Sequence, residues 1–231
     1  MSRESREGAS QTTILTHAVM VGVTPLIPIP FLDDAVKIYL LRRLVRTIGT
    51  ARGVTLDDEA VKALADDQGG GCLLGCLGTV LFYPIKKIFR KIFFLLEWKR
   101  AVDLVSATYH RAILVDHAMA GGGLVRGPAA VRAAVDTVVR ETPTRPVEEA
   151  VRTTFRQSKK ALGGAAAIMQ RAVSGLRRRA TPDEVGAALE PVRDEEAHQV
   201  EGVVSSLGDR INAIPKEHFD IMRRRLDELL G

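Results

Sequence analysis

The side chains best suited to chemistry in this 231-residue sequence are two cysteines and five histidines. Cys72 and Cys76 lie four residues apart, which on one helix is a poor geometry for a disulfide. No second cysteine or histidine cluster completes a zinc site around them. We therefore expect packed thiols from a reducing compartment, with acylation beside a membrane-surface helix as the alternative.

The histidines give no metal-binding pattern. His110 and His117 lie seven residues apart on one predicted helix face, and the position between them is Leu114. Bundle metal sites place an acid or a histidine three or four residues from the first ligand. The acids of "DEEAHQ", residues 194–199, surround His198 without a second such motif, which predicts a solvated helix face. No metal or cofactor is expected.

No catalytic motif occurs either. The sequence has no phosphate-binding G-x-x-x-x-G-K-[ST], no G-x-G-x-x-G after a strand, and no nucleophile elbow. We therefore expect a protein that is not an enzyme.

The charge is distributed unevenly along the chain, whose net charge is +5. Residues 69–180 are strongly basic, whereas residues 181–231 carry twelve acidic and six basic side chains. This asymmetry indicates either docking of the tail on the middle of the chain or an anionic partner, and solvated helix faces are the alternative. The short arginine runs at 177–179 and 223–225 lack a recognition fold, so nucleic acid is not an expected partner.

The most informative segment is "LFYPIKKIFRKIFFLLEWKR", residues 81–100. At about 100° per residue, Ile85, Ile88, Phe89, Ile92 and Leu96 share one face, with four cations opposite. This layout is typical of a helix that lies on a membrane surface. Two aromatic residues project on the cationic side, so the last turns should be buried in protein or lipid. The predicted membrane or partner contacts are Lys86, Lys87, Arg90, Lys91, Phe94 and Trp98.

Two apolar stretches have to be tested as membrane spans. Residues 14–32 are long enough, but three prolines in the second half predict a helix over 13–23 followed by an extended crossing. Residues 71–83 are too short to span unless the following lysines snorkel or the helix is re-entrant. There Gly71 and Gly75 form a small-residue helix-packing motif, with Cys72 and Cys76 in the next register. Insertion of either stretch into lipid stays open.

The fold class is predicted to be all-α, a multi-helix bundle with an N-terminal helical hairpin core and C-terminal amphipathic helices. Further helices are expected from Asp33 to the glycines at 49–53, after a cap at Thr55 and Asp58, over 72–119 with a break at Pro84, and over 128–141. A long helix over 146–179, two more before Pro215, and a last one after it complete the prediction. We divide the chain into a disordered tip (1–12), a helical, membrane-associated region (13–122) and a C-terminal helical region (123–231).

The order of "TPLIPIPFLDD", a long helix, "GVTLDDEAVKAL", a glycine cluster and a hydrophobic hairpin resembles a known family over residues 13–122. It is similar to the YcjF-like or EcsC-like bacterial membrane-associated domains, often found beside small GTPase domains. The matching residues are Pro28, Ile29, Pro30 and Asp33. The sequence differs from the family in the cations that interrupt its hydrophobic hairpin. The resemblance implies membrane association and a nucleotide-switch partner, and it assigns no catalytic residue.

Three functions are compatible with these features. The first is a non-enzymatic, cytoplasmic adaptor or scaffold, peripheral on the inner face of the cell membrane, that binds anionic lipid and a protein partner such as a GTPase. The second is a soluble all-α protein-interaction domain. The third is a pore-forming or membrane-disrupting effector in which residues 71–98 insert. The oligomeric state is not indicated.

Overall fold

The computed structural model describes residues 3–27, 29, 32–66, 86–177 and 179–231. Side chains are described from residue 11 onward and, in the long helix that begins at Lys86, from residue 96 onward. Within these ranges every regular element is helical and no strand occurs, so the all-α prediction is confirmed. The predicted packing motif of Gly71, Cys72, Gly75 and Cys76 lies outside the described residues.

The helices follow one another with short connections. They are α1 (Arg3–Val23), η1 (Thr24–Leu26), α2 (Leu32–Arg52), α3 (Asp58–Ala65), α5 (Lys86–Ala120), η3 (Gly123–Arg126), α6 (Pro128–Glu141), α7 (Arg145–Gln157), α8 (Lys159–Val173), α9 (Pro182–Leu189), η4 (Glu190–Val192), α10 (Arg193–Asn212) and α11 (Lys216–Leu230).

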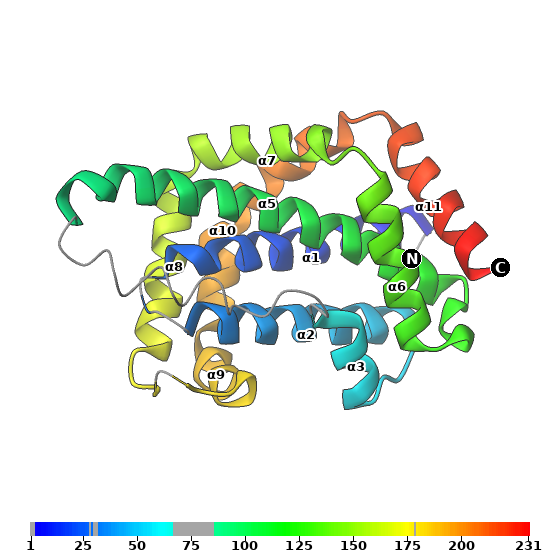
Figure 1. Ribbon diagram of the computed structural model, residues 1–231, viewed down its shortest axis with the longest axis horizontal. Helices are drawn as coiled ribbons and strands as arrows, with labels where there is room; N and C mark the ends of the chain where they lie inside the picture. The colour runs from blue at the N-terminus through cyan, green and yellow to red at the C-terminus, as the bar shows by residue number, and fades with distance from the viewer. Residues whose placement is uncertain (1–2, 28, 30–31, 67–85, 178) are drawn as a thin grey trace.

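Helix α1 is the centre of the bundle (Figure 1). Every residue from His17 to Pro25 is buried, and α1 packs against α2, α5 and α10. A helix that is apolar all round is stable only where other elements cover all its sides. The helical part of the first apolar stretch, residues 14–23, therefore lies in the middle of the protein core. Gly22 permits this packing, because a Cβ there would lie 2.1 Å from Cγ2 of Val105 on α5.

The ends of the first helices differ in detail from the predictions. Helix α1 begins at Arg3, inside the range expected to be a disordered tip, and ends at Val23 as expected. After η1 the backbone is extended at Ile27. The predicted cap of α3 at Thr55 is wrong: Asp57 caps it instead, and its carboxylate accepts a 2.7 Å hydrogen bond from the backbone N–H of Ala60. Asp57 has the extended backbone that an N-cap residue needs.

The single long helix predicted over 146–179 is also wrong, because the chain bends at Ser158 between α7 and α8 and α8 ends at Val173. The backbone N–H of Ser158 bonds the carbonyls of Thr154 and Phe155, which closes α7. The two helices share α10 as a neighbour and differ in the others: α7 lies along α5, whereas α8 runs toward α9 (Figure 1). The predicted apolar stripe is nevertheless buried on both sides of the bend: Val147, Val151, Phe155, Leu162, Ala166, Met169 and Val173.

One hydrophobic core joins the two regions into which the sequence was divided. It runs from Ile14 on α1 to Leu226 on α11 without a break at residue 122. The acidic tail does dock on the rest of the chain, through apolar side chains on α10 and α11: Val200, Val203, Leu207, Met222 and Leu226.

Candidate functional site

The predicted membrane-contact helix is the beginning of α5, a continuous helix of 35 residues. At about 1.5 Å per residue, such a helix is on the order of 50 Å long. Its second half lies in the core, whereas its first turns extend past the ends of α7 and α8 (Figure 1). Lys86, Lys87, Arg90, Lys91 and Phe94 lie on these turns, and their side chains are outside the described ones.

The first described side chain of this segment is Leu96, which is 59% exposed. It belongs to the face that the sequence predicts to be the apolar side of a surface-lying helix. A single exposed leucine is ordinary on a protein surface, so Leu96 counts only as a part of that predicted face.

Trp98 attaches this helix to the bundle. Its indole packs edge-on against Phe155 of α7, with ring centroids 5.8 Å apart, and the Lys159 ammonium lies 5.9 Å above its ring. Trp98 is half-buried and Phe155 is fully buried. Trp98 therefore packs against protein. The projecting turns of α5 precede this residue in the chain.

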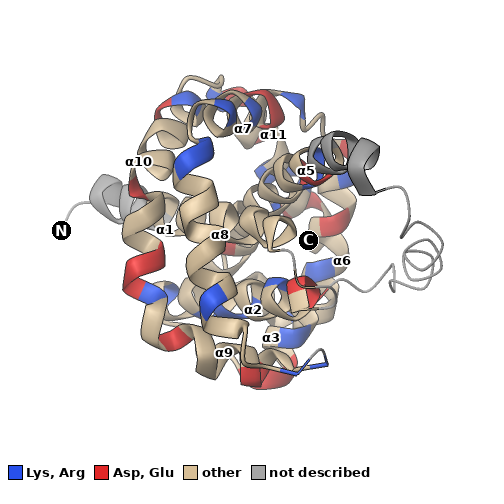
Figure 2. Cartoon of the chain, turned by 90° about the vertical axis from the view of Figure 1, so that its left-hand side faces the viewer, with Lys and Arg blue, Asp and Glu red and all other residues tan. Residues whose placement is uncertain are grey.

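Three exposed cations gather where α7 meets α8, next to Trp98. We call Arg156, Lys159 and Lys160 the basic corner. None of the three forms an ion pair within the described part of the chain. Figure 2 shows the blue turn at the start of α8. Sequence reasoning missed this corner because it lies some sixty residues after the projecting turns of α5; the cue in the sequence was "RQSKK", residues 156–160.

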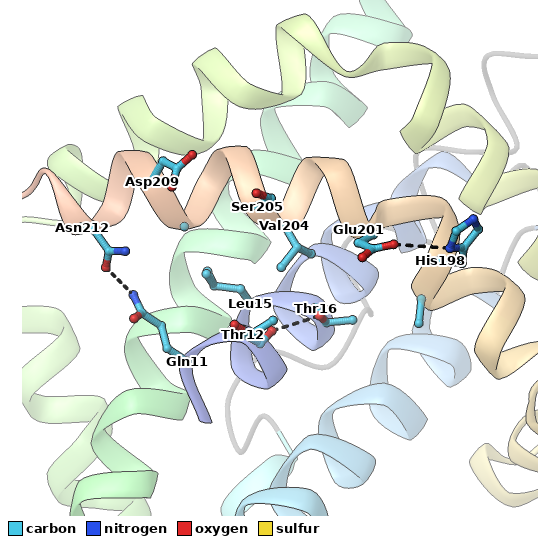
Figure 3. Close-up of a pocket in the computed structure, with 12 residues that line it drawn as sticks. Gln11, Thr12, Leu15, Thr16, His198, Glu201, Val204, Ser205, Asp209 and Asn212 are labelled. Atoms are coloured by element: carbon cyan, nitrogen blue, oxygen red, sulfur yellow. Dashed lines mark hydrogen bonds and ion pairs between the residues drawn. The ribbon is translucent and has the colours of Figure 1, made fainter. Parts of the chain in front are cut away.

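A second surface feature is an open groove of about 590 Å³ between α1 and α10 (Figure 3). Gln11 donates a 3.0 Å hydrogen bond to Asn212 at one end, and His198 pairs with Glu201 at 3.3 Å near the other. The residues lining the groove are Gln11, Thr12, Leu15, Thr16, Ala197, His198, Glu201, Val204, Ser205, Gly208, Asp209 and Asn212. This mixture of hydroxyl, amide and carboxylate groups over an apolar floor can hydrogen-bond a polar segment. Its two walls are almost two hundred residues apart in sequence, which is why the pattern alone did not reveal it.

The expectation that "DEEAHQ" is a solvated face is correct for His198, whose side chain is 87% exposed, but wrong for Glu196, which is 1% exposed. Glu196 shares the buried face of α10 with Val200 and Val203. Its Oε1 has no hydrogen-bond partner among the described residues, and burial raises the pKa of its carboxyl to about 7. Burial has the opposite effect on a histidine and lowers the pKa of His17 on α1 to about 4.

The two histidines considered as a metal pair point to different partners on α11. His110 is fully buried and faces His218, whereas His117 lies 2.9 Å from Asp227. Within the ranges described, no three or more histidine, cysteine or acidic side chains converge on a metal position.

No protein-family model matches the chain, and neither a curated protein nor a solved structure does. Among the described residues, no helix combines the length and apolar character needed to cross a bilayer.

Proposed function

We propose that this protein is a non-enzymatic adaptor that lies on an anionic membrane surface on the cytoplasmic side and there holds a protein partner. The observation that carries the proposal is the projection of the first turns of α5, with their basic and aromatic sequence, beyond the bundle (Figure 1).

The projecting helix has the composition that membrane-surface helices use. Its sequence places cations opposite an apolar face, so that the cations can reach lipid phosphates while the apolar face enters the boundary between head groups and acyl chains. The exposed Leu96 supports this orientation, because it continues the apolar face.

The basic corner adds charge beside the same helix. Arg156 and Lys160 are exposed and form no ion pair within the described residues, so they are available to an anionic surface. Each Lys or Arg held close to such a surface contributes about 1 kcal/mol. The two clusters together would make binding strongly dependent on salt.

Two observations support the proposal of a protein partner. They are the resemblance to GTPase-associated membrane domains and the groove between α1 and α10. The residues that line the groove come from α1 and α10, and none comes from α5. A protein bound there would not compete with lipid for the projecting helix.

Sedimentation with vesicles tests the lipid part. We expect recovery with vesicles that contain phosphatidylserine and not with pure phosphatidylcholine, and release by salt near 0.5 M. The double charge reversal K87E/K91E should reduce recovery, whereas K216E/R224E, the same charge change at exposed positions of α11, should not. Equal recovery on both vesicle types, no recovery on either, or equal loss in the two double variants would contradict the proposal.

The groove also favours a second candidate function, a soluble protein-interaction domain. Here the partner occupies the α1–α10 groove and the start of α5 contacts protein instead of lipid. Three results together would support this function: the protein is a monomer, it does not bind vesicles, and it loses its bound protein partner in S205R but keeps it in K87E/K91E.

A further inference from the structure

Two histidines from helices far apart in the sequence meet where α11 packs on α5. His110 is fully buried and His218 is partly buried, and their Nε2 atoms lie 3.5 Å apart. The rings meet at 72°, with Tyr109 and Phe219 edge-on beside them. The pair is unrelated to the proposed lipid-binding surface.

The contacts of His110 determine where its proton lies. Its Nδ1 is 2.8 Å from the backbone carbonyl of Ser106. A carbonyl can only accept a hydrogen bond, so Nδ1 carries the proton and Nε2 presents its lone pair toward His218. A metal-binding histidine is oriented in this way, with its other nitrogen donating to a carbonyl or carboxylate. Burial also lowers the pKa of both rings, that of His110 to about 4.

The distance between the two nitrogens is compatible with a shared metal ion. A separation of 3.5 Å is long for a hydrogen bond, which has a usual range of about 2.7–3.2 Å. It is too short for a bridging water, which needs about 4.5 Å or more between its partners at normal hydrogen-bond lengths. Two Zn–N bonds of about 2.05 Å that end on these atoms would subtend about 117°, close to the tetrahedral angle.

We propose that His110 and His218 together bind a divalent transition-metal ion of the zinc class through their Nε2 atoms, with solvent in the remaining positions. Imidazole nitrogen favours Zn²⁺, Ni²⁺ and Cu²⁺ over Mg²⁺ or Ca²⁺. With two protein ligands the ion binds more weakly than in a four-ligand structural site and exchanges through the partly exposed His218. Because the ligands come from α5 and α11, the ion fastens the C-terminal helix to the core.

Thermal unfolding of the full chain with and without metal is the test. We expect saturating Zn²⁺ to raise Tm by about 5–10 °C relative to EDTA, because a ligand that binds only the folded state stabilises it. Mg²⁺ should cause no shift. H218A should lose the zinc shift, whereas H198A, at a histidine with an 87% exposed side chain, should keep it, as should C72S/C76S. No shift in the natural sequence, or an equal shift in H218A, would overturn the proposal.

A spectroscopic measurement on the unmodified chain covers the case in which H218A fails to fold. Sub-stoichiometric Co²⁺ or Ni²⁺ should broaden the ring signals of His110 and His218 before those of His17, His117 and His198. Broadening that begins at His198 or His117 would show that the metal binds elsewhere and would overturn the assignment.

Discussion

Trp98 and Phe155 form an edge-to-face contact, with ring centroids 5.8 Å apart and 65° between the ring planes. Phe155 is fully buried and Trp98 is half-buried, so the contact lies at the boundary of the core. It joins the start of α5 to the corner where α7 bends into α8. The same contact therefore positions the projecting turns of α5 next to the basic corner.

Truncation of this pair should reduce stability in proportion to burial. We expect F155A to lower the free energy of unfolding by about 3–5 kcal/mol, as for other buried aromatics, and W98A by about half of that. A double-mutant cycle should give a coupling of about 1 kcal/mol for the edge-to-face pair. Urea unfolding measures all three values. A coupling near zero would show that the rings do not interact in solution.

Charge reversal at the basic corner should weaken lipid binding without affecting the fold. In R156E/K160E, two exposed cations that form no ion pair within the described residues become anions, so stability should change by less than about 0.5 kcal/mol. Affinity for phosphatidylserine vesicles should fall about 30-fold or more, at about 1 kcal/mol per cation. Lys159 is left in place because it contacts Trp98. Unchanged vesicle affinity would remove the basic corner from the lipid-binding surface.

Glu196 should make stability depend on pH. Its pKa is raised to about 7 in the folded chain, from about 4.5 when unfolded, so its protonated form is favoured by folding. Stability from this group is therefore complete below pH 4.5 and is lost as the pH rises to about 7, because the unfolded state releases its proton first. E196Q should raise Tm at pH 8 and have little effect at pH 4.5. E217Q, at an exposed position of α11, is the control and should show no such difference.

Two glycines should respond in opposite ways to alanine. At Gly22 a Cβ would lie 2.1 Å from the Val105 side chain and 3.0 Å from the Ala101 carbonyl, so G22A should destabilise by about 1–3 kcal/mol through overpacking. At Gly163, an exposed position inside α8, nothing lies within 4 Å of the added methyl group. G163A should therefore stabilise by about 0.5–1 kcal/mol, because alanine favours the helix. The two variants would be compared by thermal unfolding, and a neutral or stabilising G22A would contradict the packing of α1 on α5.

The positions of the helices could be predicted from hydrophobic periodicity and from helix-breaking residues. The stripe from Val147 to Val173 is buried as its spacing predicts, and α1 ends at Val23, two residues before Pro25. Errors occurred where two local signals competed. At the start of α3, Thr55 and Asp57 can each cap a helix, and the backbone conformation decides between them. At Ser158, a continuous apolar period gave no sign of the change of direction that brings α7 against α5 and α8 against α9.

Only the tertiary structure decided which apolar segments are buried in protein and which distant residues come into contact. Hydrophobic periodicity was enough to predict that this protein is all-α, because short apolar side chains recur at helical spacing. It could not determine that residues 14–23 lie inside the bundle rather than in lipid, since both environments favour the same apolar side chains. Nor could it bring His110 to His218, Gln11 to Asn212 or Lys159 to Trp98, because helix packing, unlike periodicity, joins residues that are far apart along the chain.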